Sequence, residues 1–267
     1  MIRREATSSD GQPVWLLIPQ TQHALLAGML ASRWAAFPGL SSVAREQLLI
    51  GVYLHDAGWN DWDDAPEIDL ELGRPYQFTE MPGVSMLPIW RNSISTCEAQ
   101  APLAGYAASG HFCELLERHL AKLTSRREIH EAKQFLERES ARRERCKWLW
   151  AQHGEIAELE LAVRYLQAFD FISLWLCCTR SQTCLELSVP HDGERHFRFI
   201  PTLSDPMRSW IDPWPLSAAT FEASLIARQV AAACYQCREA FLGAPSEKVP
   251  LTWRMGRLSG NRAGVTD

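Results

Sequence analysis

Three features that mark large classes of protein are missing from this sequence of 267 residues. Basic residues are not in excess, since the net charge is −5, which argues against general binding to nucleic acid or to an anionic membrane surface. No apolar stretch approaches the roughly 18 residues needed to span a membrane. The opening residues, MIRREATSSDGQ, are not followed by the apolar segment of a secretory signal. We therefore expect a cytoplasmic protein that binds neither nucleic acid nor membrane.

The 8 cysteines also lack a recognisable framework. They are scattered along the chain, and the CxxC motif occurs once, at Cys234 and Cys237. A zinc ribbon would need a second such pair. We interpret most of these cysteines as thiols in a reducing compartment, several of them buried, although a redox role for the CxxC motif stays open.

The composition is that of an ordinary globular protein, with 46% hydrophobic residues, and the 11 tryptophans add bulk to a sizeable core. The pattern of hydrophobic residues predicts three parts. Residues 1–19 form a β-hairpin turned at Asp10-Gly11, residues 20–180 form a helical domain, and residues 181–267 form a small β-rich subdomain packed on it. The predicted fold is mainly α: a helical bundle with a small β-rich cap built from the N-terminal hairpin and the C-terminal segment.

Within this outline, helical periodicity covers residues 20–34, 41–59, 103–123, 125–147 and 155–178. Residues 60–84 are expected to form a long acidic loop. A second hairpin is predicted to turn at Asp192-Gly193, so the His191-Asp192 pair is assigned to turn chemistry. Residues 219–230 fit a strand and a helix about equally well, and the tail after Gly243 has no regular pattern.

Several acids and histidines fall on apolar helical faces, where an uncompensated charge is costly. Asp170 lies in the middle of the apolar stripe of its helix. His55 follows Leu48 and Val52 on a second helix, and Asp56 occupies the neighbouring stripe. His23 and His111 lie on apolar faces of two further helices.

Each of these residues alone could be an ordinary satisfied core residue, but together they point inward from different helices. Burial favours neutral histidines, the form that ligates metals, and leaves carboxylates in need of a cation. A divalent ion would satisfy all of them. Imidazole and carboxylate ligands without thiolate suit manganese, iron, cobalt, nickel or zinc. The predicted metal ligands are His23, His55, Asp56, His111 and Asp170.

This ordered set resembles the HD superfamily of metal-dependent phosphohydrolases, which are all-α proteins. The resemblance covers residues 20–178 and places the family's ligands at His23 in QTQHALL, at His55 and Asp56 in YLHDAGW, and at Asp170 in QAFDFISLW. The residues around these motifs are still more similar to a bacterial HD-like family of unknown function.

The sequence departs from the HD pattern at two points. HD nucleotidases often carry a glutamate three residues after the aspartate of the pair, and that position is Trp59 here. Asp61, Asp64 and Glu67 are the nearby substitutes for proton transfer. Enzymes of this superfamily with two metals supply further histidines, for which His111 and, less well placed, His119 are the candidates. We therefore expect one metal ion.

The resemblance implies hydrolysis of a small phosphorylated molecule, in which the metal activates water. Arg33, Arg74 and Arg91 are candidate partners for the phosphate, although each also fits an ordinary surface position. Three alternatives stay open: an iron oxygenase of HD type, a non-catalytic metal-binding or regulatory module, and a purely structural cluster in which Asp170 pairs with a histidine or an arginine.

Overall fold

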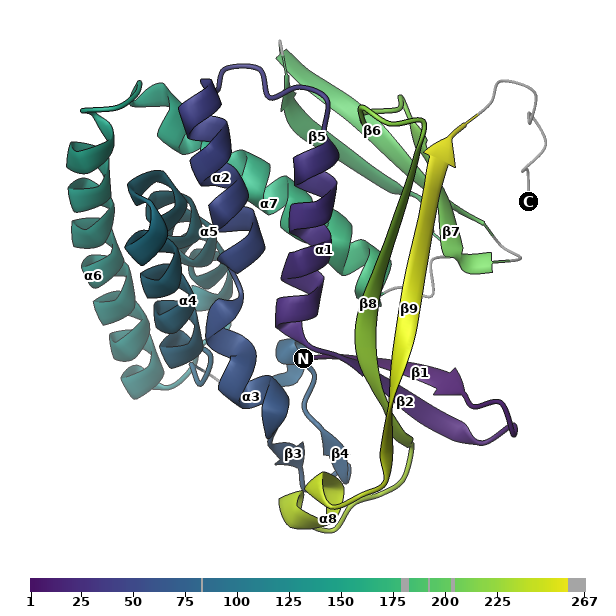
Figure 1. The fold of residues 1–267 in the computed structure, drawn as a ribbon. Helices are drawn as coiled ribbons and strands as arrows, with labels where there is room; N and C mark the ends of the chain where they lie inside the picture. The colour runs from purple at the N-terminus through teal and green to yellow at the C-terminus, as the bar shows by residue number, and fades with distance from the viewer. Residues whose placement is uncertain (83, 179–182, 192, 203–204, 259–267) are drawn as a thin grey trace.

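The computed structural model consists of a group of helices packed against one large, curled β-sheet (Figure 1). It describes the whole chain except residues 83, 179–182, 192, 203–204 and 259–267. The helices come from the first two thirds of the chain, whereas the sheet combines strands from both ends. Helices make up about half of the chain.

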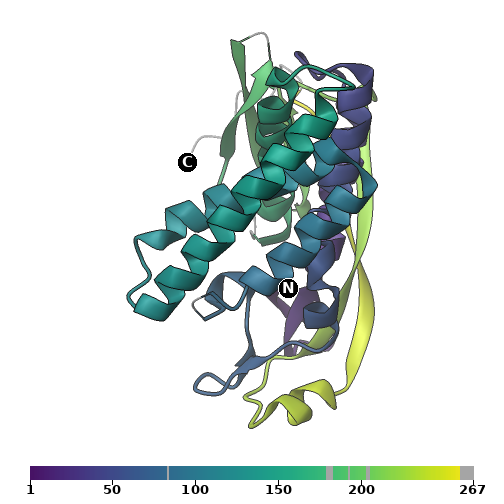
Figure 2. The ribbon, with the colours of Figure 1, turned by 90° about the vertical axis from the view of Figure 1, so that its left-hand side faces the viewer.

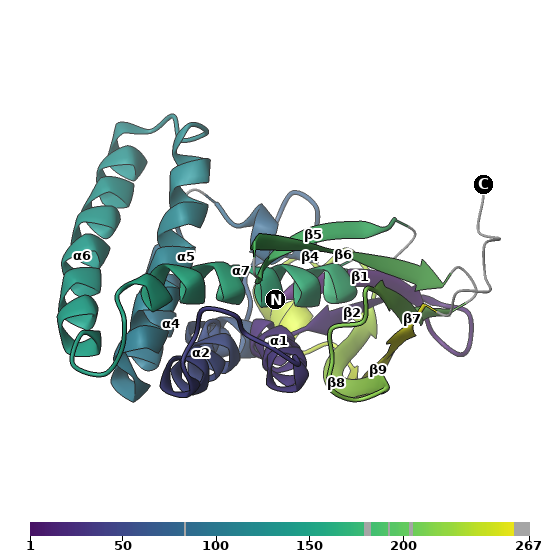
Figure 3. The same ribbon diagram turned by 90° about the horizontal axis from the view of Figure 1, so that it is seen from above.

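The long helix α7 (Ala157–Cys178) lies at the centre of the fold. It packs against α1 (Gln20–Arg33), α2 (Ser42–Leu54) and α5 (Pro102–Leu120), and its second half lies against the sheet (Figure 3). An outer layer consists of α4 (Leu87–Gln100) and α6 (Arg126–Trp150), which flank α5 on the side away from the sheet (Figure 2). The remaining helical turns are short: η1 (Ala57–Trp59), α3 (Asn60–Asp64), η2 (Phe78–Glu80) and α8 (Arg238–Leu242).

The large sheet has seven strands in the order β1-β2-β8-β9-β7-β6-β5. All neighbours pair antiparallel except β7 and β9, which are parallel. The strands are β1 (Ile2–Thr7), β2 (Pro13–Ile18), β5 (Leu185–His191), β6 (Gly193–Thr202), β7 (Asp205–Asp212), β8 (Thr220–Ala231) and β9 (Ser246–Arg257). A separate pair, β3 (Ile68–Asp69) and β4 (Arg74–Pro75), lies in the segment after α3.

The prediction of a mainly α, all-α bundle with a small β-rich cap is therefore wrong. The sheet is a principal layer, and its two longest strands, β8 and β9, contain 12 residues each. The segment 219–230, which fitted two templates, is a strand because its residues alternate strictly between exposed and buried over its first eight positions. The tail expected to be irregular contains β9, which lies between β7 and β8 near the middle of the sheet.

The helical predictions were better, with one omission. The five predicted helices correspond to α1, α2, α5, α6 and α7, and the two predicted hairpins are β1–β2 and β5–β6. Asp192, at the second turn, lies outside the described residues. Helix α4 was missed, and the segment expected to be one long loop contains α3, β3, β4 and η2.

The sequence was expected to hold no apolar stretch long enough to span a membrane, and α7 shows that this expectation was wrong. It is long and apolar enough to cross a membrane by length and composition, but 67% of its most apolar window is buried inside the fold. Its buried side chains include Leu166, Phe169 and Ile172, which belong to the same core as Phe199 and Trp253 of the sheet. The Trp253 indole donates a hydrogen bond to the Leu176 carbonyl at 3.1 Å. The apolar character of α7 is thus that of a helix covered on several sides.

Candidate metal centre

His23 lies in the first turn of α1, which follows the hairpin of β1 and β2. The helix begins directly after Pro19, and its buried face carries His23, Leu26, Ala27 and Leu30. The His23 side chain is 0% exposed, and its Nδ1 lies 2.6 Å from Ser173 Oγ on α7. Because the Ser173 hydroxyl donates to the Asp170 carbonyl at 2.9 Å, it accepts the proton of His23 Nδ1. The lone pair of the neutral ring is therefore on Nε2.

His55 and Asp56 lie where α2 changes into a 3₁₀ turn. The α-helix ends at Leu54, His55 keeps helical angles, and Asp56 has φ −107° and ψ 18°. The two adjacent side chains can therefore reach one point, which a regular helix would not allow. His55 Nδ1 donates to the Val52 carbonyl at 2.8 Å, so its Nε2 also carries the lone pair.

Gly58 lies in the 3₁₀ turn η1, two residues after Asp56. The Gly58 amide donates to Ser93 Oγ on α4 at 3.0 Å. A Cβ atom at this position would collide with the Ile89 carbonyl of the same helix. Glycine therefore permits the close approach of α4 to the segment that carries His55 and Asp56.

Four of the predicted ligands converge on one point. Asp170 Oδ1 lies 3.1 Å from His23 Nε2 and 3.2 Å from His55 Nε2. Asp56 Oδ2 lies 3.3 Å from His23 Nε2 and 3.6 Å from His55 Nε2, and the two histidine Nε2 atoms are 3.3 Å apart. Ligands bound at about 2.0–2.2 Å from one ion are separated by roughly 3.0–3.5 Å. The spacing of His23, His55 and Asp56 is thus that of donors around a single ion, so these three residues could hold a metal, and Asp170 Oδ1 lies next to both histidines.

The electrostatics of the cluster depend on the same contacts. Burial would lower the pKa of His23, but hydrogen bonds to Asp170 and Asp56 outweigh it and raise the pKa to about 9. Burial would likewise raise the pKa of Asp170, and the hydrogen bonds to His23 and His55 hold it well below its usual value. Without a metal ion, His23 is therefore protonated at neutral pH and shares its Nε2 proton with the two carboxylates; a metal ion would replace this proton.

His111 on α5 lies beside this cluster rather than inside it. Its Nε2 is 3.7 Å from Asp170 Oδ2, and its ring centroid is 5.9 Å from that of His55. Burial lowers the pKa of His111, which favours the neutral ring. Its buried Nδ1 has no hydrogen-bond partner among the described residues. His119 is not part of any cluster of possible metal ligands in the described chain.

One face of the centre opens into a pocket of about 560 Å³ between α5, α7, β5 and η2. His111 and Asp170 form part of its wall. The rest of the lining includes apolar side chains, two arginines and one acid: Leu115, Phe171, Leu174, Leu187, Arg118, Arg164 and Glu114. Glu114 pairs with Arg118 at 3.3 Å. Leu115 and Phe171 are 36% and 49% exposed, which is unusual for large hydrophobic residues in a group.

The predicted proton donors do not reach this pocket. Asp61, Asp64 and Glu67 are exposed on and after α3, and Glu67 forms an ion pair with Arg238 at 3.2 Å. The buried acid of this segment is Asp63, which accepts a hydrogen bond from the Gln20 amide at 2.6 Å. Trp59, at the position where HD nucleotidases often carry a glutamate, is 2% exposed, and its indole N–H is not acidic enough to serve as a proton donor in catalysis.

The predicted phosphate partners also lie elsewhere. Arg33 stacks over the Phe221 ring at 5.4 Å, and Arg74 forms an ion pair with Glu80 at 2.9 Å. Arg91 is on α4, and none of the three lines the pocket beside Asp170.

The two arginines that line this pocket were not identified from the sequence, although their spacing along the helices could have indicated them. Arg118 follows His111 by seven residues on α5, and Arg164 precedes Phe171 by seven on α7. Residues seven apart share one face of a helix.

Comparison with known proteins gives one match. A family model described as protein of unknown function (DUF3891) matches residues 1–232, which include the hairpin, all the residues of the candidate centre and strand β8. No curated protein and no solved structure matches the chain.

Proposed function

This chain belongs to the family of unknown function DUF3891, so its activity has to be argued from its own residues, and we propose that it is a metal-dependent phosphohydrolase of HD type. The observation that carries the proposal is the orientation of two imidazoles. Their Nδ1 protons are held by Ser173 and by the Val52 carbonyl, so both Nε2 atoms face the carboxylates of Asp56 and Asp170, and a metal ion would bind there by displacing a proton. Such fixing of the tautomer is typical of histidines that ligate metals.

In this proposal, His23, His55, Asp56 and Asp170 hold one divalent ion of the manganese, iron, cobalt, nickel or zinc group. When bound, the ion lowers the pKa of a coordinated water and polarises a phosphoryl oxygen. His111 lies between the proposed ligands and the pocket. Its Nε2 could either bind the metal ion or exchange a proton with the substrate.

The 560 Å³ pocket supports a particular class of substrate. Arg118 and Arg164 can attract a phosphate group, because guanidinium ions bind phosphate oxygens well. Arg118 pairs with Glu114 at an exposed position, so a phosphate would compete with this carboxylate for the guanidinium. The exposed side chains of Leu115 and Phe171 offer an apolar surface next to the centre. The substrate we propose is a small phosphate ester with an apolar organic group.

The test combines metal analysis with turnover. Protein purified without a histidine tag should contain about one divalent ion per chain and should release phosphate from aryl or alkyl phosphate monoesters. Asp170→Asn should lose both metal and turnover, whereas Glu186→Gln, which neutralises an exposed carboxylate on β5, should keep both. Protein that acquires no manganese, iron or zinc on incubation would refute the proposal.

A second candidate is an iron oxygenase. Its support is the ligand set of two histidines and one carboxylate, His23, His55 and Asp56, which is the pattern of non-haem iron oxygenases when positions on the ion stay open. Oxygen consumption by the iron-loaded protein, without phosphate release from any ester, would favour it. A third candidate is a binding or regulatory module, supported by Trp59 at the position where HD nucleotidases often carry a glutamate. Metal binding without either turnover would favour that role.

A further inference from the structure

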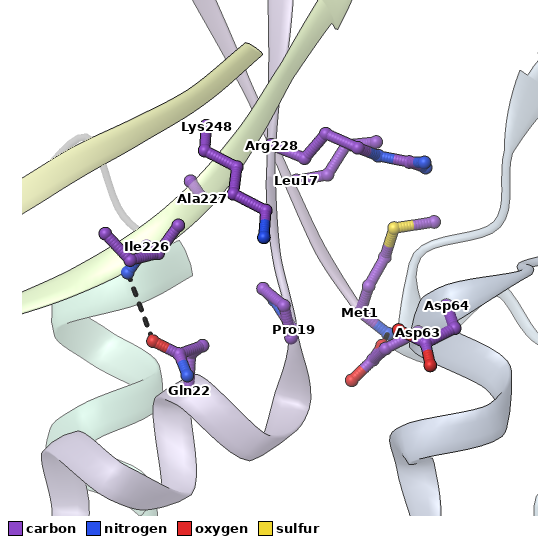
Figure 4. Close-up of a pocket in the computed structure, with 10 residues that line it drawn as sticks. All are labelled: Met1, Leu17, Pro19, Gln22, Asp63, Asp64, Ile226, Ala227, Arg228 and Lys248. Carbon is purple, nitrogen blue, oxygen red and sulfur yellow. Dashed lines mark hydrogen bonds and ion pairs between the residues drawn. The ribbon is translucent and has the colours of Figure 1, made fainter. Parts of the chain in front are cut away.

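A second pocket, of about 460 Å³, lies where the hairpin, helix α1 and the two longest strands meet (Figure 4). It arises because β2 pairs with β8 only as far as Arg228, and α1 takes the place of β2 beside the rest of β8. There the Gln22 side chain accepts a hydrogen bond from the Ile226 amide at 3.1 Å. The metal centre and its 560 Å³ pocket share no lining residue with this second pocket.

Two cations from neighbouring strands line this pocket. Arg228 on β8 and Lys248 on β9 are partners in the antiparallel register, so their side chains leave the same face of the sheet. In Figure 4 the Lys248 ammonium points toward Pro19, and the Arg228 guanidinium points toward the side of Met1. Like charges directly opposite each other destabilise a sheet. The next charged pair of the same strands, Glu222 and Arg254, combines opposite charges at 2.9 Å. The pairing of Arg228 with Lys248 thus places like charges opposite each other, unlike the pairing of Glu222 with Arg254.

Neither cation is neutralised within the described part of the chain. No acidic side chain there lies within ion-pair distance of Arg228 or Lys248, and Arg228 Nη2 is buried without a hydrogen-bond partner. The guanidinium stacks over the Phe241 ring at 5.1 Å, and burial lowers the pKa of Arg228. A half-buried guanidinium with a free donor costs free energy unless an acceptor binds it.

Neither acid that lines the pocket forms an ion pair with Arg228 or Lys248 in the described part of the chain. Asp63 is occupied, since it lies 2.9 Å from the Met1 amino group and accepts the Gln20 amide. Asp64 is exposed, and its charge partly offsets the lowering of the Arg228 pKa by burial, but no ion pair joins the two side chains. Figure 4 shows both aspartates beside Met1, away from Lys248. Apolar side chains complete the lining: Leu17, Pro19, Ile226 and Ala227.

We propose that this second pocket binds a small phosphate monoester, whose phosphate group Arg228 and Lys248 hold together. Two unpaired cations call for a dianion, and a phosphate monoester carries about −1.5 to −2 at neutral pH, whereas a carboxylate neutralises one cation alone. The planar guanidinium can donate two parallel hydrogen bonds to phosphate oxygens, and the ammonium adds a point charge. The apolar lining receives the organic group.

Phenyl phosphate is a suitable probe, and its binding to the metal-free full chain is measured by isothermal titration calorimetry at low salt. We expect Arg228→Gln and Lys248→Gln each to raise the Kd by about tenfold or more, as the loss of one charge-assisted contact requires. Arg254→Gln is the matched control, because it removes a cation from the same two strands outside the pocket. It should leave the Kd unchanged. Circular dichroism checks that each variant is folded.

Four results would overturn the proposal. The first is no binding of phenyl phosphate to the parent chain, and the second is an equal Kd for the parent and both pocket variants. The third is binding that Asp170→Asn removes and Arg228→Gln leaves intact, which would assign the ligand to the pocket beside the metal centre. Benzoate binding as tightly as phenyl phosphate would reject a site for dianions. The outcome is independent of whether the metal centre is catalytic, because the probe is bound without metal.

Discussion

His23 and Ser173 are joined by a 2.6 Å hydrogen bond between Nδ1 and Oγ, and this contact decides which nitrogen of His23 faces the candidate metal centre. The Ser173 hydroxyl donates a hydrogen bond to the Asp170 carbonyl, one turn earlier on the same helix. A residue outside the ligand set thereby fixes the tautomer of one ligand and is tied to the backbone of another.

The first prediction concerns this serine. Ser173→Ala removes the acceptor of the His23 Nδ1 proton, so His23 can populate the other tautomer and rotate. We expect metal affinity to fall by about 10- to 100-fold, the usual effect of losing a partner of this kind. Competition with a chromophoric chelator measures the change. Ser109→Ala, which removes a fully buried hydroxyl on α5, is the control, and an equal loss in both variants would contradict the assigned role.

The second prediction concerns stability. An ion that binds the folded chain alone adds about 2.7 kcal/mol when its free concentration is 100 times the Kd. Addition of manganese or zinc to the metal-free protein should therefore raise the Tm, and a chelator should reverse the shift. Asp170→Asn should lose this dependence, because Asp170 Oδ1 touches both histidines. Melting curves that are the same with metal and with chelator would contradict the proposed centre.

The candidate centre could be predicted from the sequence because it depends on local rules. His23, His55 and Asp170 each occupy an apolar helical face, and a buried polar side chain needs a partner wherever the helix packs. Geometry then places their donor atoms between 3.1 and 3.3 Å apart. The proton donor was harder to predict, since proximity in sequence suggested Asp61 and Asp64, whereas the pocket is reached from α5 and α7.

The sheet could not be predicted because its order depends on contacts between distant segments. β9 pairs with β7 and β8, and β2 near the start of the chain pairs with β8 more than 200 residues later. The alternation of apolar and polar residues in Ser246–Arg257 does not by itself indicate that this segment lies near the middle of a sheet. Val249 and Leu251 are half-buried, so the burial pattern of β9 is less regular than that of β8.

The third prediction tests the approach of α4 to the ligand segment. Gly58→Ala places a methyl group against the Ile89 carbonyl and Ser93, so either α4 or the turn that carries His55 and Asp56 must shift. We expect a loss of about 1–3 kcal/mol in the free energy of unfolding, as for overpacked sites, together with weaker metal binding. Urea denaturation measures the first effect.

The control for this variant is Gly243→Ala. Gly243 has φ −80° and its nearest neighbour to an added Cβ is 3.2 Å away, so the substitution should cost less than about 1 kcal/mol. A Gly58→Ala variant as stable as this control would show that α4 can move without strain.

The fourth prediction concerns pH and the start of α7. The buried Glu158 carboxylate accepts the Ser41 amide at 2.6 Å and the Glu155 amide at 2.8 Å, so it links the start of α2 to that of α7. Burial would raise the pKa of Glu158, but these hydrogen bonds outweigh it and lower the pKa below its usual value. The ionised form is therefore favoured in the folded chain.

The sign of the pH effect follows from this lowered pKa. The contribution of Glu158 is fully present above the pKa of an unfolded glutamate, about 4.3, and is lost as the pH falls through the lower folded value. Glu158→Gln should therefore cost about 2 kcal/mol at pH 7, and the difference from the parent should shrink as the pH falls below about 4. Urea denaturation across this range measures it. Glu155→Gln, at an exposed position, should follow the parent at every pH, and a constant deficit in Glu158→Gln would attribute its cost to packing instead of charge.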